Sequence, residues 1–273
     1  MKNILSRNNV NILGKGKKTI LFGHGFGCDQ NIWRLMIPYF EDDYRIVLFD
    51  YVGSGKADVA AYDPQRYSTL HGYARDVIEI LEALAGDPVI FIGHSVSGML
   101  GLLASIQRPG LFAALIMLGA SPRYINDLPD YYGGFTDDEV SQLLDMMEQN
   151  FVGWASVNAA ALMNQPEQPH LTEQLKAALS AENALVMHNF AKAIFLSDHR
   201  KYLAEATVPT LIVQCSEDSI VPIEVGTYLH NHIKNSVLKV TDTKGHYPHI
   251  SQPQETAKMI LNYITGTSVS GEP

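Results

Sequence analysis

Short apolar runs alternate with amphipathic segments over the first half of the chain. Four runs rich in β-branched and aromatic residues predict buried strands: 19–22, 44–49, 89–92 and 113–118. Residues 31–40 and 69–84 place their apolar side chains on one face, which predicts helices, and residues 9–13 predict an edge strand. Because strands alternate with helices, the sequence predicts an α/β fold with a mostly parallel central sheet and helices on both faces.

The pattern changes between residues 129 and 203, where no buried strand is predicted. The periodicity predicts helices there, at 136–150, 153–163, 172–179 and 181–196. Thr136 and Glu139 have the spacing of a capping box. The strand pattern resumes at 208–214 and is followed by a helix at 222–232, a strand at 236–240 and a helix at 254–264. We therefore expect one core, 1–128 and 204–273, with a helical lid, 129–203, inserted between its halves.

Composition narrows the class of protein. The chain of 273 residues has a formal net charge of −9, which argues against a nucleic-acid partner. There is no basic run and no apolar run of membrane-spanning length, and the first residues lack an apolar signal core. The two cysteines, Cys28 and Cys215, have no metal or redox spacing. We expect a cytoplasmic protein that binds no membrane, metal or cofactor.

The strand at 89–92 continues into Gly93-His94-Ser95-Val96-Ser97-Gly98 and then into a helix-compatible apolar run. A strand, a sharp turn and a helix with serine at the apex predict a nucleophile elbow. Small residues are needed on both sides of the serine, because strand and helix pass close together there. Gly93 meets this need, whereas Ser97 stands where the motif usually has a second glycine. The alternative is an ordinary buried strand–turn–helix corner.

A serine hydroxyl becomes a strong nucleophile only when a base removes its proton, and a carboxylate usually holds that base. Asp218 follows the strand at 208–214, and His246 follows the last strand. Both lie where parallel strands end, at the same edge as Ser95, and their order along the chain is the one this kind of elbow requires. We predict a catalytic triad of Ser95, His246 and Asp218.

Three other residues are alternatives for the base and the acid. His249 lies three residues after His246, and we expect it to be a supporting or surface histidine. Glu217 adjoins Asp218 but would point elsewhere in an extended loop. Asp127 is a weaker candidate acid, because it belongs to the approach to the helical segment.

Acyl transfer also requires donors to the oxygen that becomes negatively charged. One would be the backbone N–H of Val96, directly after the nucleophile. The other would come from the glycine-rich loop 24–27, through the N–H of Phe26. The alternative for this loop is a plain strand-to-helix connection. The segment 50–55 contains G-x-G but no complete dinucleotide motif, so we expect no dinucleotide site.

These segments resemble the α/β-hydrolase superfamily. The resemblance rests on the elbow, on Gly23-His24-Gly25-Phe26-Gly27-Cys28-Asp29-Gln30, on 49–55 and on Gly245-His246-Tyr247-Pro248-His249. More narrowly, the chain resembles the RsbQ-like bacterial stress-response regulators and is similar to the plant karrikin and strigolactone receptors. Further matching segments are 121–124, 132–135, 153–154 and 195–200.

The resemblance implies a small apolar cavity under a V-shaped lid of four helices, with this lining: Phe26, Val96, Tyr124, Phe135, Trp154, Ile194, Phe195 and Ile220. It also implies a small apolar ester or lactone as ligand and, for an RsbQ-like protein, a partner phosphatase with a PAS sensor domain. Two functions stay open, a signalling hydrolase that acts through a partner and a stand-alone metabolic carboxylesterase. A non-catalytic binding scaffold is disfavoured by the complete triad.

Overall fold

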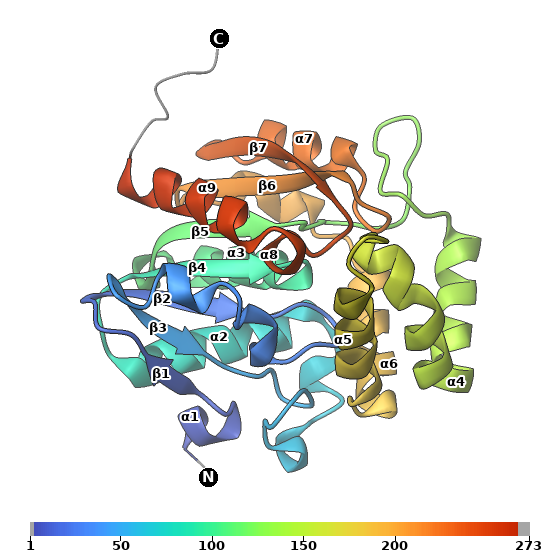
Figure 1. Cartoon of the computed structure of the whole chain (residues 1–273), viewed down its shortest axis with the longest axis horizontal. Coiled ribbons are helices and arrows are strands. Elements are labelled where there is room, and N and C mark those ends of the chain that lie inside the picture. Colours follow the sequence, from blue (N-terminus) through green and yellow to red (C-terminus); the bar gives the residue numbers. More distant parts are fainter. Residues whose placement is uncertain (1–2, 267–273) are drawn as a thin grey trace.

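The fold is built on a seven-stranded sheet, seen in a computed structural model that describes residues 3–266 (Figure 1). The strand order is β1-β3-β2-β4-β5-β6-β7. Strand β1 pairs antiparallel with β3 at one edge, and every other pairing is parallel. This confirms the predicted α/β architecture. The strands are β1 Asn11–Leu13, β2 Lys18–Gly23, β3 Tyr44–Leu48, β4 Val89–His94, β5 Phe112–Leu118, β6 Thr210–Glu217 and β7 Ser236–Lys244.

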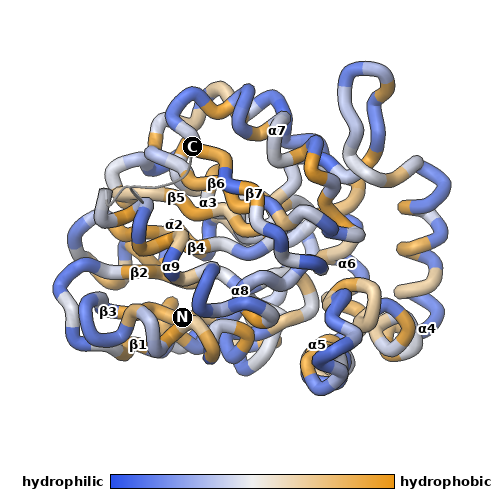
Figure 2. Tube along the Cα trace, turned by 45° about the horizontal axis from the view of Figure 1, so that its top comes forward, coloured by the Kyte–Doolittle hydropathy of each residue, from blue (hydrophilic) through white to orange (hydrophobic). Residues whose placement is uncertain are grey.

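The core lies on both faces of the central strands. All six residues of β4 are buried, and this strand pairs parallel with β2 and β5, with Ile90 opposite Ile20 and Ala114. The pairing with β5 shifts its register between Val89 and Ile90. The hydropathy colouring in Figure 2 follows this burial, because the central strands are mostly hydrophobic. A parallel sheet covered on both faces needs such continuous apolar runs, which is why the sequence revealed these strands.

Helices cover both faces of the sheet. Helices α2 and α3 pack together on one face, while α8 and α9 lie together on the opposite face (Figure 1). The α-helices are α1 Ile4–Arg7, α2 Leu70–Leu84, α3 Val96–Gln107, α4 Asp137–Met163, α5 Pro169–Ser180, α6 Ala184–Phe195, α7 Ile223–His232, α8 Pro248–Ser251 and α9 Pro253–Thr265. Among the described residues, no helix has the length and apolar character needed to cross a bilayer.

The helix predicted at residues 31–40 is wrong. This segment forms two 3-10 turns, η1 Gln30–Trp33 and η2 Ile37–Tyr39. Pro38 lacks a backbone N–H, and its ring would clash with the preceding turn of a continuous α-helix. Trp33 and Phe40 are nevertheless buried, so the apolar spacing reported burial correctly but not the type of helix.

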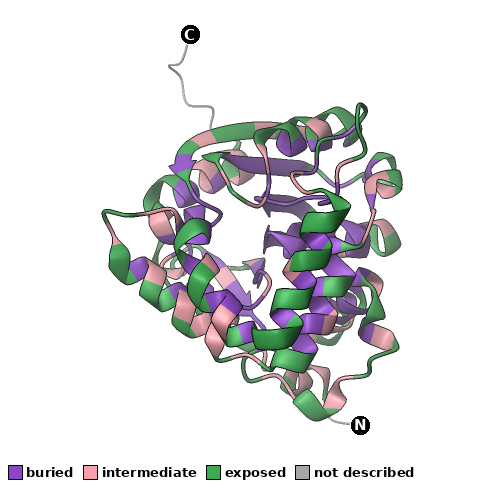
Figure 3. Cartoon of the chain, turned by 90° about the vertical axis from the view of Figure 1, so that its right-hand side faces the viewer, coloured by how far each residue is buried: buried purple, intermediate pink, exposed green. Residues whose placement is uncertain are grey.

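Helices α4, α5 and α6 occupy the chain between β5 and β6, beyond the carboxyl ends of the strands (Figure 1). Helix α4 begins with the predicted capping box between Thr136 and Glu139. It is interrupted by non-helical backbone at Asn150, whose side chain accepts a hydrogen bond of 2.8 Å from the Gly153 amide. Figure 3 shows the molecule from the side on which α4, α5 and α6 lie; these helices expose their outer faces and bury their inner ones. The kink explains why the sequence indicated two helices there.

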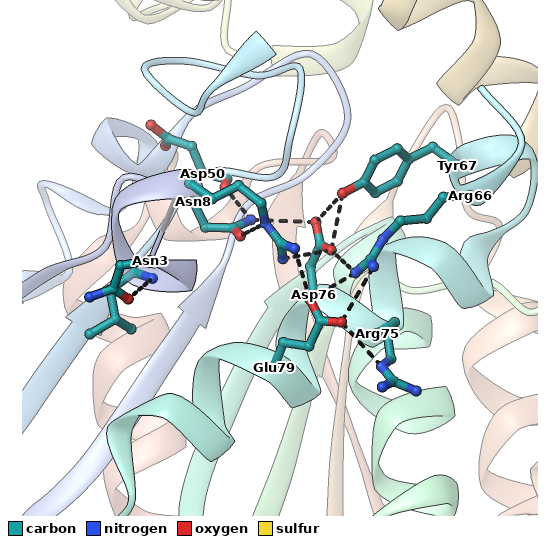
Figure 4. Close-up of polar contacts among 10 residues, drawn as sticks. Asn3, Asn8, Asp50, Arg66, Tyr67, Arg75, Asp76 and Glu79 are labelled. Carbon is teal, nitrogen blue, oxygen red and sulfur yellow. Dashed lines mark hydrogen bonds and ion pairs between the residues drawn. The ribbon is translucent and has the colours of Figure 1, made fainter. Parts of the chain in front are cut away.

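A buried ionic cluster ties the start of the chain to helix α2 (Figure 4). The fully buried Asp76 carboxylate accepts hydrogen bonds from Arg7 at 2.9 Å, from Arg66 at 2.5 Å and from the Tyr67 hydroxyl at 3.0 Å. The same two arginines bind Glu79. Partial burial acts to raise the pKa of Glu79, but the bonds from Arg66 and Arg7 outweigh it and lower that pKa. The cluster therefore joins Arg7, near the start of the chain, to the segment 66–79, which lies 69 residues away at the Arg7–Asp76 bond.

Asp76→Ala is expected to lower the free energy of unfolding by about 3 kcal/mol, because two partly buried guanidinium groups lose the fully buried one of their two shared carboxylates. Urea denaturation measures the change. Asp42→Ala is the control, since Asp42 pairs with Lys15 where both side chains are largely exposed, and it should leave stability unchanged. Equal stability of wild type and Asp76→Ala would contradict a structural role for the cluster.

The loop between α5 and α6 is anchored to the core by Glu182, whose carboxylate accepts hydrogen bonds from the Gly55 amide at 3.2 and 3.3 Å. Burial raises the pKa of Glu182 to about 7. The Gly55 amide opposes this shift, and the nearby carboxylates of Asp29 and Asp50 add to it. The folded protein therefore favours the protonated form of this carboxyl group.

This pKa makes stability depend on pH in a defined direction. The pKa of Glu182 is higher in the folded chain than in the unfolded one, so its contribution is complete below pH 4.5 and is lost as pH rises through 7. Glu182→Gln keeps an acceptor for Gly55 but carries no charge. We expect its Tm to exceed that of wild type by a few degrees at pH 8 and to match it at pH 4.5. Identical Tm differences at both pH values would contradict this titration.

Candidate active site

Ser95 occupies the apex of a strand–turn–helix corner, between the last residue of β4 and the first residue of α3. Its backbone has φ 55° and ψ −123°, a strained conformation for a residue with a side chain. The Ser95 amide donates a 2.7 Å hydrogen bond to the Leu118 carbonyl at the end of β5. A Cβ added to Gly93 would lie 2.5 Å from the carbonyl carbon of Ser97, so the close approach of strand and helix requires glycine there.

His246 and Asp218 form a buried pair. The Nδ1 atom of His246 lies 2.7 Å from a carboxylate oxygen of Asp218, and the two side chains are 4% and 0% exposed. The other carboxylate oxygen accepts from the amides of Ile220 at 2.8 Å and Val221 at 3.1 Å. With Asp218 ionised, Nδ1 must carry a proton to donate to it. In neutral His246 the Nε2 atom is therefore an acceptor, as a general base requires.

Helix α4 contributes to the placement of His246. The His246 amide donates to the Leu162 carbonyl at 2.8 Å, and the Gln165 side chain donates to the Lys244 carbonyl at 2.9 Å. The C-terminal end of α4 therefore contacts the loop that carries His246. A movement of this end of α4 would therefore displace the backbone of His246, to which it is hydrogen-bonded.

The three alternative residues for the acid and the base make other contacts. Glu217 pairs with Lys244, and both side chains are more than half exposed. Asp127 binds Arg200 at 2.8 Å near the surface. His249 was expected to be a supporting or a surface histidine. It is fully buried against the Trp33 ring, 4.4 Å between centroids, which excludes the surface position. Burial lowers the pKa of His249 to about 3, so its ring is neutral at physiological pH.

The His94 side chain makes a contact with the His246 loop that was not predicted from the sequence. Its Nε2 atom lies 2.8 Å from the His246 carbonyl oxygen, and a carbonyl only accepts, so Nε2 carries the proton. Burial is the main cause that lowers the pKa of His94 well below 6.5, so the ring stays neutral. His94 therefore ties the strand that carries Ser95 to the loop that carries His246. The only signal in the sequence was its place beside the serine.

The glycine-rich loop lies against the elbow. A Cβ on Gly25 would be 2.5 Å from His94 Nδ1 and 3.5 Å from the Ser95 Cβ, so glycine permits this approach. Within the described part of the chain, neither the Phe26 amide nor the Val96 amide donates a hydrogen bond to a protein acceptor. Both N–H groups are thus available to an oxygen bound beside Ser95, as an oxyanion hole requires.

An apolar cavity of about 40 Å³ adjoins Ser95 and His246. Its other lining residues are Phe26, Tyr124, Trp154, Leu162, Leu179, Ile194, Phe195, Ile220 and Tyr247. Six predicted lining residues are among them. Phe135 and Val96 are not: Phe135 packs against Phe195, 6.1 Å between centroids, and Val96 lies within the elbow helix. Leu162, Leu179 and Tyr247 were missed, because no spacing in the sequence relates them to the elbow.

The polar side of the cavity is formed by few groups. The Tyr124 hydroxyl faces Ser95, and burial raises the pKa of Tyr124 although its hydrogen bond with Ser95 opposes the shift.

A larger groove of about 840 Å³ runs along β7 and α9, but its lining includes neither Ser95 nor a histidine. Within residues 3–266, no group of three or more His, Cys, Asp or Glu side chains is placed so that it could hold a metal ion. Of these two pockets, the cavity at Ser95 is the one that brings together Ser95, His246 and Phe26.

Known proteins share this architecture. The family model described as the alpha/beta hydrolase fold matches residues 18–253. A karrikin insensitive 2 receptor of Petunia hybrida is 40% identical over 258 residues, covering 94% of this chain and 95% of its own. A strigolactone esterase of Pisum sativum is 37% identical over 258 residues, covering 94% and 96%. A solved hydrolase structure from Oleispira antarctica superposes with a TM-score of 0.94 at 39% identity, over 97% of both chains. The chain belongs to the alpha/beta hydrolase fold family.

Proposed function

We propose that the protein is a serine hydrolase that cleaves a small apolar ester or lactone with Ser95, His246 and Asp218. The observation that carries this proposal is the buried His246–Asp218 pair, held at 2.7 Å beside a serine with strained backbone. A hydrogen-bonded carboxylate favours the imidazolium that forms when His246 takes the serine proton. The apolar cavity supports a ligand that carries no charge.

In the proposed reaction, Ser95 Oγ attacks the carbonyl carbon of the ester as its proton passes to His246 Nε2. The Phe26 and Val96 amides donate to the resulting oxyanion. Collapse of the tetrahedral intermediate breaks the bond to the leaving alkoxide, which receives the proton from His246. Water then attacks the acyl-enzyme with His246 again acting as base, which releases the acid and restores Ser95.

We propose that helices α4–α6 act as a lid that must move for ligands to enter. A cavity of about 40 Å³ has room for about three water molecules, which is less than any aryl ester occupies. Hydrolysis of p-nitrophenyl acetate, butyrate and octanoate, measured beside that of a simple butenolide, tests the substrate class. We expect kcat/KM to fall with acyl length, and absence of turnover for every ester and for the butenolide would contradict the proposed activity.

We further propose that the protein serves in signalling through a protein partner in the cytoplasm. This rests on relatives named as receptors, at 39–40% identity, and on the resemblance to the RsbQ-like regulators. For an RsbQ-like role the partner is a phosphatase with a PAS domain, and its target is a stress-response pathway. A stand-alone carboxylesterase is the competing function.

Charge reversal on α4 separates these two functions. Asp137 and Asp138 are exposed at the start of α4, whereas Glu139 caps the helix and is left unchanged. We expect Asp137→Lys with Asp138→Lys to keep ester hydrolysis but to lose the partner captured from native cells by the wild-type protein. Glu255→Lys, in the first turn of α9, is the exposed control and should keep both. Capture of no partner by wild type would favour the plain esterase.

A further inference from the structure

Ser97 stands where nucleophile elbows usually have glycine, and the structure gives its hydroxyl two partners. It is completely buried in the first turn of α3. Its Oγ atom donates to the His24 carbonyl oxygen and lies 2.8 Å from the Tyr51 hydroxyl. Because a carbonyl only accepts, the single Ser97 proton points to His24, and Tyr51 must donate to Ser97. The departure from the motif thus joins the elbow helix to the glycine-rich loop.

His24 extends this network to the peptide group that follows Gly25. The His24 Nε2 atom accepts from the Tyr51 amide at 3.2 Å, so the ring proton resides on Nδ1. Nδ1 lies 2.9 Å from the Gly25 carbonyl oxygen and donates to it. Burial lowers the pKa of His24, which keeps the ring in this neutral form. Each buried polar atom of the network has a partner, so the arrangement is well determined.

The Gly25 carbonyl and the Phe26 N–H belong to one planar trans peptide, and in such a peptide they point in opposite directions. Fixing the carbonyl toward His24 therefore directs the Phe26 N–H away from His24. A hydrogen bond accepted by the carbonyl also polarises the N–H of the same peptide. Rotation of this peptide would remove an oxyanion donor without disturbing the triad.

We infer that Tyr51, Ser97 and His24 form a positioning network that holds the Phe26 N–H in place as an oxyanion donor, with Ser97 as its central residue. None of the three lines the cavity, so they act through the backbone and not by contact with substrate. The inference rests on the proposed hydrolase function, since an oxyanion donor matters only if Ser95 performs acyl transfer.

Ser97→Ala tests the network, because it removes the hydroxyl and keeps the Cβ atom. We expect kcat/KM for p-nitrophenyl acetate to fall about 30-fold with KM nearly unchanged, since a donor to the oxyanion stabilises the transition state more than the bound ester. The Ki of a trifluoromethyl ketone, whose adduct with Ser95 carries the same oxyanion, should rise by the same factor. Tyr51→Phe leaves the bond from Ser97 to His24 and should cost only about threefold.

Ser105→Ala is the matched control. Ser105 lies in the same helix and is equally buried, but its hydroxyl donates to the Leu102 carbonyl within α3, at 2.8 Å. It should leave both kcat/KM and the Ki unchanged. If Ser97→Ala lowers Tm but keeps wild-type kcat/KM, or if the Ki does not follow kcat/KM, the positioning role is overturned. Should Ser97→Ala fail to fold, the same Ki comparison is made on Tyr51→Phe.

Ser95→Ala is measured beside these variants and identifies which proposal has failed. Loss of turnover in Ser95→Ala together with wild-type turnover in Ser97→Ala would refute the network alone. Full turnover in Ser95→Ala would refute the hydrolase function on which the network depends.

Discussion

Ser95→Ala is expected to lower kcat/KM for p-nitrophenyl acetate by about 10³-fold or more. The substitution removes the only atom that can attack the carbonyl carbon from the apex of the elbow. In the proposed mechanism, binding in the cavity and two amide donors would remain, and they account for only a residual acceleration over water, on the order of 10³-fold. Stopped-flow or steady-state release of nitrophenolate measures the loss.

The fold should survive this change. Ala is no larger than Ser. Two backbone hydrogen bonds hold the strained backbone at position 95: the residue 95 amide donates to the Leu118 carbonyl, and the Gly98 amide donates to the carbonyl of residue 95. An unchanged Tm would therefore assign the loss to chemistry. Wild-type turnover in a folded Ser95→Ala protein would show that another group performs the hydrolysis.

Asp218→Asn should be nearly as severe, with a loss in kcat of about 10³-fold. An Asn oxygen can still accept from the Ile220 and Val221 amides, so the loop keeps its anchors. Its NH₂ group would then face His246 Nδ1 and donate to it. The imidazole proton would shift to Nε2, which could no longer accept the proton of Ser95. The charge that favours the imidazolium would also be absent.

The control for Asp218 is its neighbour Glu217, which is exposed and paired with Lys244. Glu217→Gln should keep kcat within about twofold of wild type, because a surface pair contributes little and no bond from Glu217 reaches His246. Equal losses in the two variants would mean that the acid is wrongly assigned. A steady-state assay of both proteins at one pH decides between these outcomes.

Local features of the chain that depend on neighbouring residues were predictable. The buried strands, the capping box at Thr136 and Glu139 and the sharp corner at Ser95 follow from short patterns of apolar, polar and small residues. The meeting of Ser95, Asp218 and His246 was inferred because parallel strands end at one edge. At residues 31–40 the apolar spacing was misleading, since Pro38 does not permit the helix that this spacing suggests.

Contacts between distant segments were not predictable. The bond between Ser97 and His24 joins residues 73 positions apart, and nothing in the elbow motif indicates it. The bond from the His246 amide to the Leu162 carbonyl depends on where α4 ends against the core. His249 is buried against the ring of Trp33. Phe135 lies outside the cavity lining and packs against Phe195. Such contacts are set by tertiary packing and have no local signature.

The most direct test of the central claim is to label the protein with a fluorophosphonate and to locate the adduct by mass spectrometry of its peptides. Such reagents react with a serine only when a base has activated its hydroxyl. A single phosphonate on Ser95, lost in His246→Ala and strongly slowed in Asp218→Asn, is the result that the proposed triad predicts. An unlabelled wild-type protein, or an adduct on another residue that persists in Ser95→Ala, would contradict it.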